Sequence, residues 1–160
     1  MRPICSIVLL LILLTACDDI TVAGDTVSIT NDTWQSVNKV EFSMPVMDSI
    51  NSYHLFFTVR NTNEYPFSNL YLIATLKYPH GKTVVDTIEY KMAKPDGSWL
   101  GNGIGSVKES KLYYKENFIF KELGEYQLTV EQAVRDNGDV QGVSSLTGIS
   151  NVGYSIEKIE

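Results

Sequence analysis

The sequence predicts an all-β protein: a two-sheet antiparallel β-sandwich of about seven or eight strands, either immunoglobulin-like or jelly-roll-like. Two observations lead to this prediction. Apolar and polar residues alternate in segment after segment from residue 39 onward, and clusters of Gly, Pro, Asn and Asp separate these segments at short intervals. With 160 residues, 44% of them hydrophobic and 20% charged, the chain is long enough for one domain with its own core.

The first sixteen residues have the layout of a secretory signal peptide. Arg2 precedes an apolar run from residue 4 to residue 14, and the small residues Thr15 and Ala16 follow it. Crossing a bilayer takes ~20 apolar residues, so this run is too short for a transmembrane helix. We therefore expect residues 1–16 to be removed as a lipoprotein signal peptide.

Residues 14–17 (Leu-Thr-Ala-Cys) resemble the lipobox of bacterial lipoproteins, whose cysteine becomes the lipid-bearing first residue of the mature chain. The resemblance implies that Cys17 carries a diacylglyceryl thioether and an amino group acylated by a palmitate-type chain. Two or three acyl chains hold a protein on a membrane almost permanently, because each buried CH₂ contributes ~0.8 kcal/mol. The alternative is that Cys17 is an ordinary cysteine beside a cleavage site.

Residues 17–34 are rich in Asp, Thr, Ser and Gly, and they are interpreted as a lipidated N-terminus and tether. The sandwich domain is then expected to cover residues 35–160. Pro45 is expected at a sheet edge or bulge because it has no backbone donor for a ladder. The candidates for short helices are residues 143–149 and 108–111.

Seven segments of the domain are predicted to be strands. In the clearest of them Tyr53, Leu55, Phe57 and Val59 would point inward, because successive side chains of a strand alternate between its two faces. The strongest patterns cover residues 53–60, 69–78 and 125–134. Weaker strands, rich in β-branched and aromatic residues, are predicted at residues 39–46, 82–91, 111–121 and 151–159.

Charge and residue inventory exclude several functions. A net charge of −6 argues against nucleic-acid binding, which needs clustered Lys and Arg. The two histidines are His54 and His80, and no thiol remains free after processing, so we expect no metal site and no cofactor. No Ser-His-Asp or Cys-His arrangement stands out, so no catalytic residue is predicted and the protein is expected not to be an enzyme. The acidic residues in segment 136–139 are interpreted as a hairpin turn rather than a calcium site.

The glycine-rich segment 96–106 partly mimics a nucleotide-binding loop. A β-like run follows it where a phosphate-binding loop would lead into a helix, so this reading is rejected. The segment is interpreted as a long loop in which Trp99 caps one end of the sandwich, with a partner-binding rim as the alternative. Aromatic residues near loops also raise a second function, that of a glycan-binding surface lipoprotein.

Several blocks of the mature chain, together with Cys17, resemble the GldH family of gliding-motility lipoproteins. The resemblance implies a non-enzymatic, lipid-anchored cell-envelope protein that acts as a binding or scaffold component of gliding-motility or associated secretion machinery. Its expected partners are the membrane and other envelope proteins, and its expected location is the outer membrane, facing the periplasm or the cell surface. The blocks are residues 60–61 (Arg-Asn), 65–72 (Tyr-Pro-Phe-Ser-Asn-Leu-Tyr-Leu), 96–103 (Asp-Gly-Ser-Trp-Leu-Gly-Asn-Gly), 118–131, 142–143 and 151–153.

Four residues are the candidates for partner binding: Tyr65, Trp99, Arg60 and Arg135. The two arginines are those that remain after the signal is removed, so each is expected to pair with a carboxylate or with loop carbonyls. For Tyr65 a purely structural role is the alternative, since Tyr65-Pro66 fixes a turn and the residues after it can hydrogen-bond their own backbone.

Overall fold

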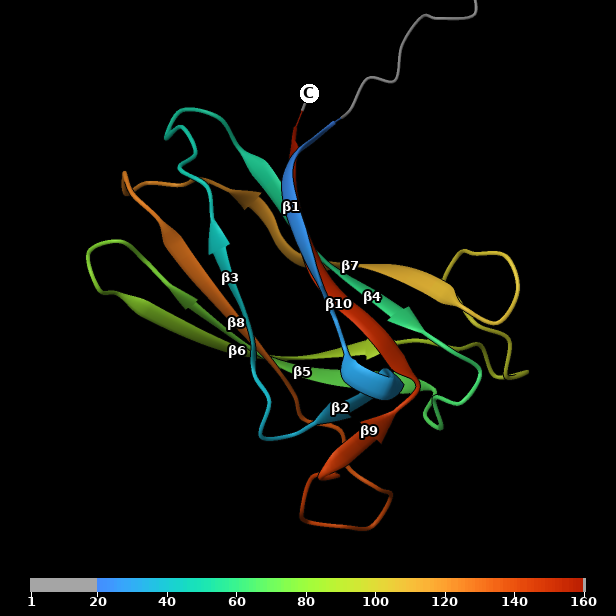
Figure 1. Cartoon of the computed structure of the whole chain (residues 1–160). Coiled ribbons are helices and arrows are strands. Elements are labelled where there is room, and N and C mark those ends of the chain that lie inside the picture. Colours follow the sequence, from blue (N-terminus) through green and yellow to red (C-terminus); the bar gives the residue numbers. More distant parts are fainter. Residues whose placement is uncertain (1–19, 160) are drawn as a thin grey trace, which may run out of the picture.

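A computed structural model describes residues 20–159, which form ten strands and one 3₁₀ turn (Figure 1). The predicted signal peptide and Cys17 lie outside the described residues. The strands are β1 (Thr21–Ser28), β2 (Thr33–Gln35), β3 (Val40–Met44), β4 (Tyr53–Asn61), β5 (Asn69–Lys77), β6 (Thr83–Lys91), β7 (Lys108–Phe118), β8 (Tyr126–Gln132), β9 (Ser145–Thr147) and β10 (Ile149–Lys158); the turn η1 (Thr30–Asp32) follows β1.

Two four-stranded antiparallel sheets face each other, in the orders β1-β10-β4-β7 and β3-β8-β5-β6. We call them sheet A and sheet C. The main pairs are nested in the chain: β1 with β10, β3 with β8, β4 with β7, and β5 with β6. This is the pattern of one long hairpin rolled across two sheets, which is the jelly roll. The predicted all-β sandwich is confirmed, and the strand order selects the jelly-roll form over the immunoglobulin-like form.

The inner faces of both sheets form one hydrophobic core. The predicted inward residues of β4, Tyr53, Leu55, Phe57 and Val59, are all buried, as expected from their alternation. The corresponding inner rows of β5 and β8 are buried too. The short pair β2–β9 lies across one end of the sandwich and places the buried Trp34 and Leu146 against this core (Figure 1).

The tether prediction is wrong over most of its length. Residues 21–28 form β1, an edge strand of sheet A that pairs with β10, and residues 33–35 form β2. The pattern of β1 gave no signal because almost all of its side chains are exposed on both faces, so no apolar row marks it as a strand. Its position is fixed by backbone pairing with β10.

The two predicted short helices are also wrong. Residues 108–111 begin β7, where they pair with residues 58–61 of β4. Residues 143–149 contain β9 and a tight turn at Gly148, followed by the start of β10. Segment 108–111 has no apolar residue to form a helical face, whereas Val143, Leu146 and Ile149 do have helical spacing. In both segments strand pairing satisfies the backbone groups instead. Pro45 follows directly after β3, an edge strand, as predicted.

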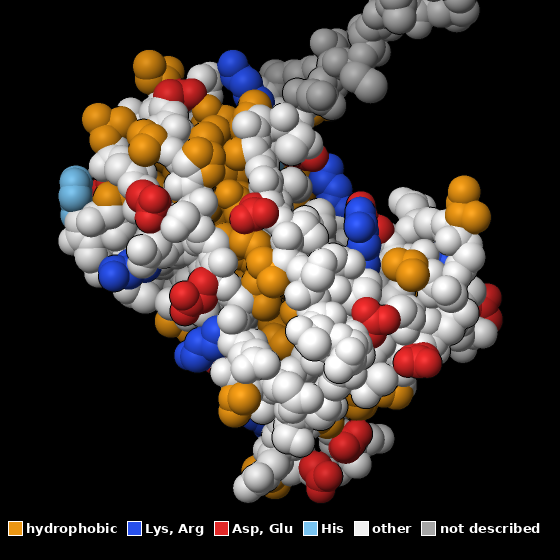
Figure 2. Space-filling model, in the orientation of Figure 1, with side chains coloured by type: hydrophobic (Ala, Val, Ile, Leu, Met, Phe, Trp, Pro, Cys, Tyr) orange, Lys and Arg blue, Asp and Glu red, His pale blue; other side chains and the backbone are white. Residues whose placement is uncertain are grey.

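The two long sides of the sandwich differ. On one side, β6 and β7 are joined by side chains: the Asp86 carboxylate accepts from Lys115 Nζ (2.7 Å) and Tyr114 Oη (3.2 Å), and Tyr90 Oη donates to the Tyr113 carbonyl (2.6 Å). On the other side, residues 27–41 line a groove of about 800 Å³ between β1 and β3. Figure 2 shows apolar side chains along the middle of this face.

The antiparallel registers divide the loops between two ends. We call one the terminal end: it holds residues 20 and 159 and the loops 45–52, 78–82 and 119–125. We call the other the far end: it holds the loops 62–68, 92–107 and 133–144 and the pair β2–β9.

Candidate binding surface

The two histidines lie on separate elements of the described chain. His54 is on the outer face of β4, where its Nδ1 accepts from the Asn117 amide (3.4 Å). His80 is exposed in the β5–β6 turn, with Nδ1 3.4 Å from Glu122 Oε2. Among residues 20–159, no group of three or more His, Cys, Asp or Glu side chains is placed to hold a metal ion.

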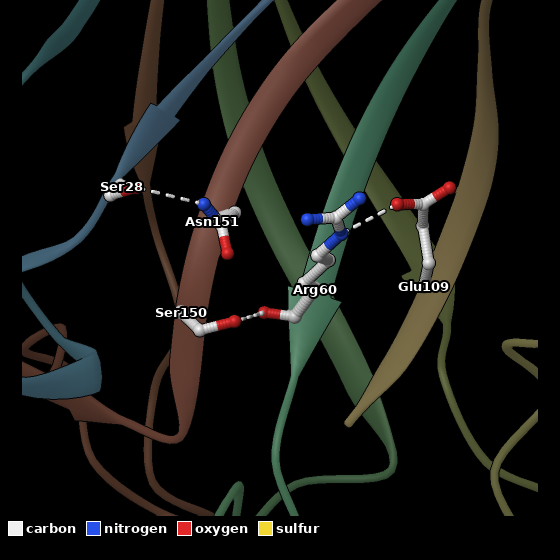
Figure 3. Close-up of polar contacts among 5 residues, drawn as sticks. All are labelled: Ser28, Arg60, Glu109, Ser150 and Asn151. Atoms are coloured by element: carbon white, nitrogen blue, oxygen red, sulfur yellow. Dashed lines mark hydrogen bonds and ion pairs between the residues drawn. The ribbon is translucent and has the colours of Figure 1, made fainter. Parts of the chain in front are cut away.

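A row of polar side chains crosses the outer face of sheet A close to the far end. Ser28 of β1, Asn151 of β10, Arg60 of β4 and Glu109 of β7 are successive register partners, so their side chains stand side by side (Figure 3). We call these four residues the polar row. Asn151 Nδ2 donates to Ser28 Oγ (3.0 Å), and Arg60 Nε donates to Glu109 Oε2 (2.6 Å).

The Arg60–Glu109 ion pair is displayed to solvent. The two side chains are 50% and 46% exposed. Exposed ion pairs typically contribute ~0–1 kcal/mol to stability, since water screens the attraction and two long side chains lose rotamer freedom. Ser150 Oγ donates to the Arg60 carbonyl (3.3 Å) beside the register shift between Ile149 and Asn151, which reinforces the backbone under the pair. The pair therefore adds little to the fold and offers both charges to a partner.

The polar row continues along sheet A toward the terminal end. Thr26, Gly153, Thr58 and Lys111 form the next row of register partners. A Cβ on Gly153 would come within 2.6 Å of both threonine hydroxyl oxygens, so glycine lets the flanking threonines close over β10. The outer surface of sheet A is thus a continuous polar face.

Phe56 is an exception on this outer face, because it is buried although it points away from the core. Tyr113 covers it, with ring centroids 4.3 Å apart, and Lys111 Nζ lies 4.3 Å from its ring centroid. Lys111 is also paired with Glu157. The apolar ring is therefore shielded by a cation and a tyrosine.

Tyr65 and Trp99 meet at the far end in an aromatic corner, with ring centroids 6.1 Å apart. Tyr65 is buried, its hydroxyl donates to the Asn69 carbonyl (2.7 Å), and burial raises the pKa of this phenol above its ordinary value. Trp99 is half-buried, and its indole Nε1 donates to Asn63 Oδ1 (3.1 Å). Gly148 (φ +83°) lies directly against Tyr65. The prediction that Trp99 caps the sandwich agrees with this packing.

Loop 92–107 joins the aromatic corner to the polar row. Asn102 and Glu109 exchange two backbone hydrogen bonds (2.7 and 2.8 Å), so the loop that carries Trp99 is fastened to the strand that carries the carboxylate of the row. Gly103 permits this approach, since a Cβ there would lie 2.5 Å from the Val107 carbonyl oxygen. The loop also exposes the apolar side chains of Leu100 and Ile104.

The structure thus brings three of the four predicted binding residues into one region. Arg60 pairs with the Glu109 carboxylate as expected, Tyr65 and Trp99 contact each other, and loop 92–107, which carries Trp99, is hydrogen-bonded to Glu109 through Asn102. Arg135 is separate: it lies in loop 133–144, is exposed, bridges Gly142 through its backbone, and forms no ion pair within residues 20–159. Its expected carboxylate partner is therefore not found there.

Glu109, Asn151 and Ser28 were not foreseen as part of this surface. Each is an ordinary polar residue in its own segment, and the row exists only through the register of four strands. An outward arginine on a predicted strand signals an acidic neighbour across the sheet, but the sequence does not say which strand supplies it.

Comparison with known families identifies the chain. A family model described as GldH lipoprotein matches residues 21–156. The chain belongs to the GldH lipoprotein family. The predicted membership of this family is thereby confirmed, and strand β1 falls inside the matched region.

Two curated GldH relatives cover nearly the whole chain. The "Gliding motility lipoprotein GldH homolog" of Christiangramia forsetii is 48% identical over 92% of this chain and 90% of its own length. The "Gliding motility lipoprotein GldH" of Flavobacterium johnsoniae is 47% identical over 92% of this chain and 91% of its own length.

Among solved structures, this GldH-family chain is similar to infectious bursal disease virus proteins. The crystal structure of the VP2 subviral particle aligns with 88% of this chain and 34% of that chain at 20% identity, with a TM-score of 0.36. The structure of the Gx strain aligns with 86% and 32% at 17% identity, with a TM-score of 0.38. The chain spans about a third of those chains, and the jelly-roll assignment rests on its own strand pairing.

No helix within residues 20–159 of this GldH-family chain has the length and apolar character needed to cross a bilayer.

Proposed function

We propose that this member of the GldH family is a non-enzymatic lipoprotein, anchored in the cell envelope through lipid on Cys17, that binds a protein partner of gliding-motility or associated secretion machinery. The names of the two curated relatives support the motility context. The expected location is the outer membrane, facing the periplasm or the cell surface.

The observation that carries this proposal is that loop 92–107 connects the polar row to the aromatic corner through the backbone hydrogen bonds between Asn102 and Glu109. Arg60 and Glu109 expose a charge pair that adds little to stability, and Trp99 belongs to the loop whose Asn102 is hydrogen-bonded to the Glu109 backbone. Arginine and tryptophan are the residue types that most often dominate the binding energy of protein interfaces. This surface lies at the far end, opposite residue 20 and the lipid, so a partner could reach it without meeting the membrane.

Affinity capture after mild cross-linking in the native cell tests the proposal. We expect Arg60→Glu to reduce recovery of an envelope partner by roughly 30-fold, because losing a dominant interface residue costs about 2 kcal/mol. Surface spreading of the cells and the level of secreted protein should fall together.

A matched control is another partly exposed ion pair, Lys39–Glu131 (3.0 Å), which joins the residue before β3 to β8. Lys39→Glu should leave partner recovery unchanged. Equal recovery with Arg60→Glu and wild-type protein would reject the polar row as the interface, and recovery of no envelope partner by the wild type would reject the function.

A second candidate is glycan binding, which the hydroxyl and amide groups of the outer face of sheet A favour. Ser28, Thr26, Thr58 and Asn151 line that face with donors and acceptors of the kind that sugars use. Trp99 is less suited to stacking on a sugar, because its ring packs against Tyr65 and its indole N–H is engaged by Asn63. A glycan array with the full domain decides between the two, and a flat response removes this candidate.

Lipidation and location have direct readouts. Intact mass of the mature protein should show an acylated Cys17 as first residue, and the protein should migrate with outer-membrane fractions on a density gradient. Cys17→Ala should release a folded protein from the membrane with loss of function. An unmodified N-terminus at this position would reject the anchor.

A further inference from the structure

The loops of the terminal end carry three exposed apolar side chains. Ile50 is 88% exposed, Leu123 is 70% exposed and Val46 is 64% exposed, and each sits in a loop of this end. Ile20, at the start of the described chain, is half exposed beside them. Figure 2 shows hydrophobic side chains gathered over these loops.

Hydrogen bonds hold this end together as one surface. Ile20 O accepts from the Lys158 amide (3.1 Å), and Ser52 O accepts from the Ile159 amide (3.3 Å). Loop 119–125 joins the same surface because Phe120 packs against Tyr53 at the start of β4, with ring centroids 5.6 Å apart. The chain that leads back to Cys17 therefore leaves from among the exposed apolar side chains.

The loops that present these side chains are ordered by their own contacts. The Asp48 carboxylate accepts from the amides of Ile50 (3.0 Å) and Asn51 (2.7 Å) and from Tyr53 Oη, so Ile50 stands at the tip of a capped turn. The Glu122 amide donates to Tyr126 Oη (3.1 Å), which fixes the residue before Leu123. Ile50 and Leu123 thus project from loops whose backbone is held by hydrogen bonds.

Exposure alone does not single out this end, because Val37, Ile104 and Val140 are exposed at the far end. What distinguishes the terminal end is the short stretch of sequence between Ile20 and the predicted lipid site at Cys17. Ile20 is three positions after Cys17 in the sequence, and a fully extended chain advances at most ~3.3–3.6 Å per residue, so the tether reaches about 10 Å. Ten ångströms is of the order of the headgroup layer on one side of a bilayer, so a lipid on Cys17 would keep the terminal end close to the membrane surface.

We propose that the terminal end is a membrane-contact surface, in which Val46, Ile50 and Leu123 enter the headgroup region and orient the far end away from the bilayer. This inference rests on the lipid anchor of the proposed function. The neighbouring Lys82, Lys121 and Lys158 are exposed at the same end, where their charges can meet lipid phosphates. The polar row and the aromatic corner then face away from the membrane.

The test uses the full lipidated protein in vesicles of phosphatidylethanolamine and phosphatidylglycerol. The mature chain has no other cysteine once Cys17 is lipidated, so a fluorophore can be placed at one site at a time through Ile50→Cys, Leu123→Cys and, as the far-end control, Ile104→Cys. We expect iodide in the water phase to quench positions 50 and 123 at least about threefold less than position 104, and brominated lipid to quench them more, as for groups buried in the headgroup layer.

The outcomes separate this inference from the function it rests on. Protein that fails to float with the vesicles and lacks lipid by mass would reject the anchor. Floating protein whose positions 50, 123 and 104 are quenched equally by iodide would overturn the membrane-contact surface while leaving the anchor intact. Shielding of positions 50 and 123 in native membranes but not in pure vesicles would also overturn it, since a protein would then cover this end.

A second measurement removes the three apolar side chains and places the label at position 20 instead. A triple variant, Val46→Ser with Ile50→Ser and Leu123→Ser, should remain anchored by its lipid but let a label at position 20 become at least about twofold more accessible to iodide. Ile104→Ser should leave the label at position 20 unchanged. No increase in the triple variant would contradict the role of these three side chains.

Discussion

At the far end of the sandwich, aromatic side chains are built into the structure, whereas at the terminal end apolar side chains project from it. Tyr65 is buried, hydrogen-bonded and pressed against Gly148, and Trp99 is tied to Asn63. Ile50 and Leu123 touch little, and the contacts of their loops are made by neighbouring residues. The comparison teaches that the aromatic corner formed by Tyr65 and Trp99 is held by the fold, while Ile50 and Leu123 at the terminal end are free to contact an outside surface.

The largest effect is expected at Gly148. Its φ of +83° disfavours any side chain, and a Cβ would lie 2.2 Å from the Tyr65 backbone nitrogen. Gly148→Ala should therefore lower the free energy of unfolding by about 3 kcal/mol or more, since strain and a backbone clash act together. Urea denaturation measures it.

Gly138→Ala is the matched control. Its φ is +95° but a Cβ there would meet nothing within 4 Å, so the loss should be limited to backbone strain, about 1 kcal/mol. Equal losses in the two variants would show that the far end is not tightly built around Tyr65.

A smaller effect is expected when Tyr65 loses its hydroxyl. Tyr65→Phe removes the hydrogen bond to the Asn69 carbonyl (2.7 Å) at a buried site, so it should cost about 1–3 kcal/mol in urea denaturation. Tyr113→Phe, at a residue that is 52% exposed, should change stability by less than about 0.5 kcal/mol. A neutral Tyr65→Phe would mean that the corner does not depend on this hydroxyl.

At the terminal end, the Asp48 cap should give a modest, pH-dependent effect. Hydrogen bonds from Tyr53 and Asn51 hold the pKa of Asp48 below its ordinary value in the folded protein. Its contribution to stability is therefore fully present above the unfolded pKa, about 4, and is lost as pH falls through the folded pKa.

Asp48→Asn tests this effect through unfolding curves at a series of pH values. The wild type should exceed the variant in stability at neutral pH, and the difference should shrink on acidification below pH 4. A difference that stays constant with pH would show that the carboxylate charge is not what orders the Ile50 turn.

The smallest effect is expected at the apolar tips themselves. Ile50→Ser and Leu123→Ser should each change the free energy of unfolding by no more than about 0.5 kcal/mol, because these side chains are 88% and 70% exposed. Leu128→Ser, at a buried position of β8, serves as the contrast and should be strongly destabilising. A large loss at Ile50 or Leu123 would place these tips in the fold and remove the contrast between the two ends.

The sequence predicted strands correctly where one face of the strand is buried in the core and the other is not. Alternation in residues 53–60 predicted the inward row of β4 because one face of that strand meets the core. Strand β1 was missed because neither of its faces is buried, and β2 and β9 because three residues are too few to show a period.

The binding surface could be predicted only in part. Arg60, Tyr65 and Trp99 could be found as unusual residues in their own segments. The partnership of Arg60 with Glu109 and of Asn151 with Ser28 depends on register between strands that are distant in the chain, and local pattern carries no information on it. The burial of the outward-facing Phe56 also depends on strand register, because Tyr113 of the neighbouring strand β7 covers it.

The nested pairing of strands has a consequence for how this protein comes into being. Thr21 of β1 donates a hydrogen bond to Glu157, 136 residues away, in the strand that is synthesised last. Contacts between residues so far apart in the sequence form slowly, because the entropy cost of closing a large loop comes before the strand hydrogen bonds that offset it. Strand β1 can pair with β10 only after Ile149–Lys158 has been synthesised, so this edge of sheet A cannot form before synthesis of the chain is nearly complete.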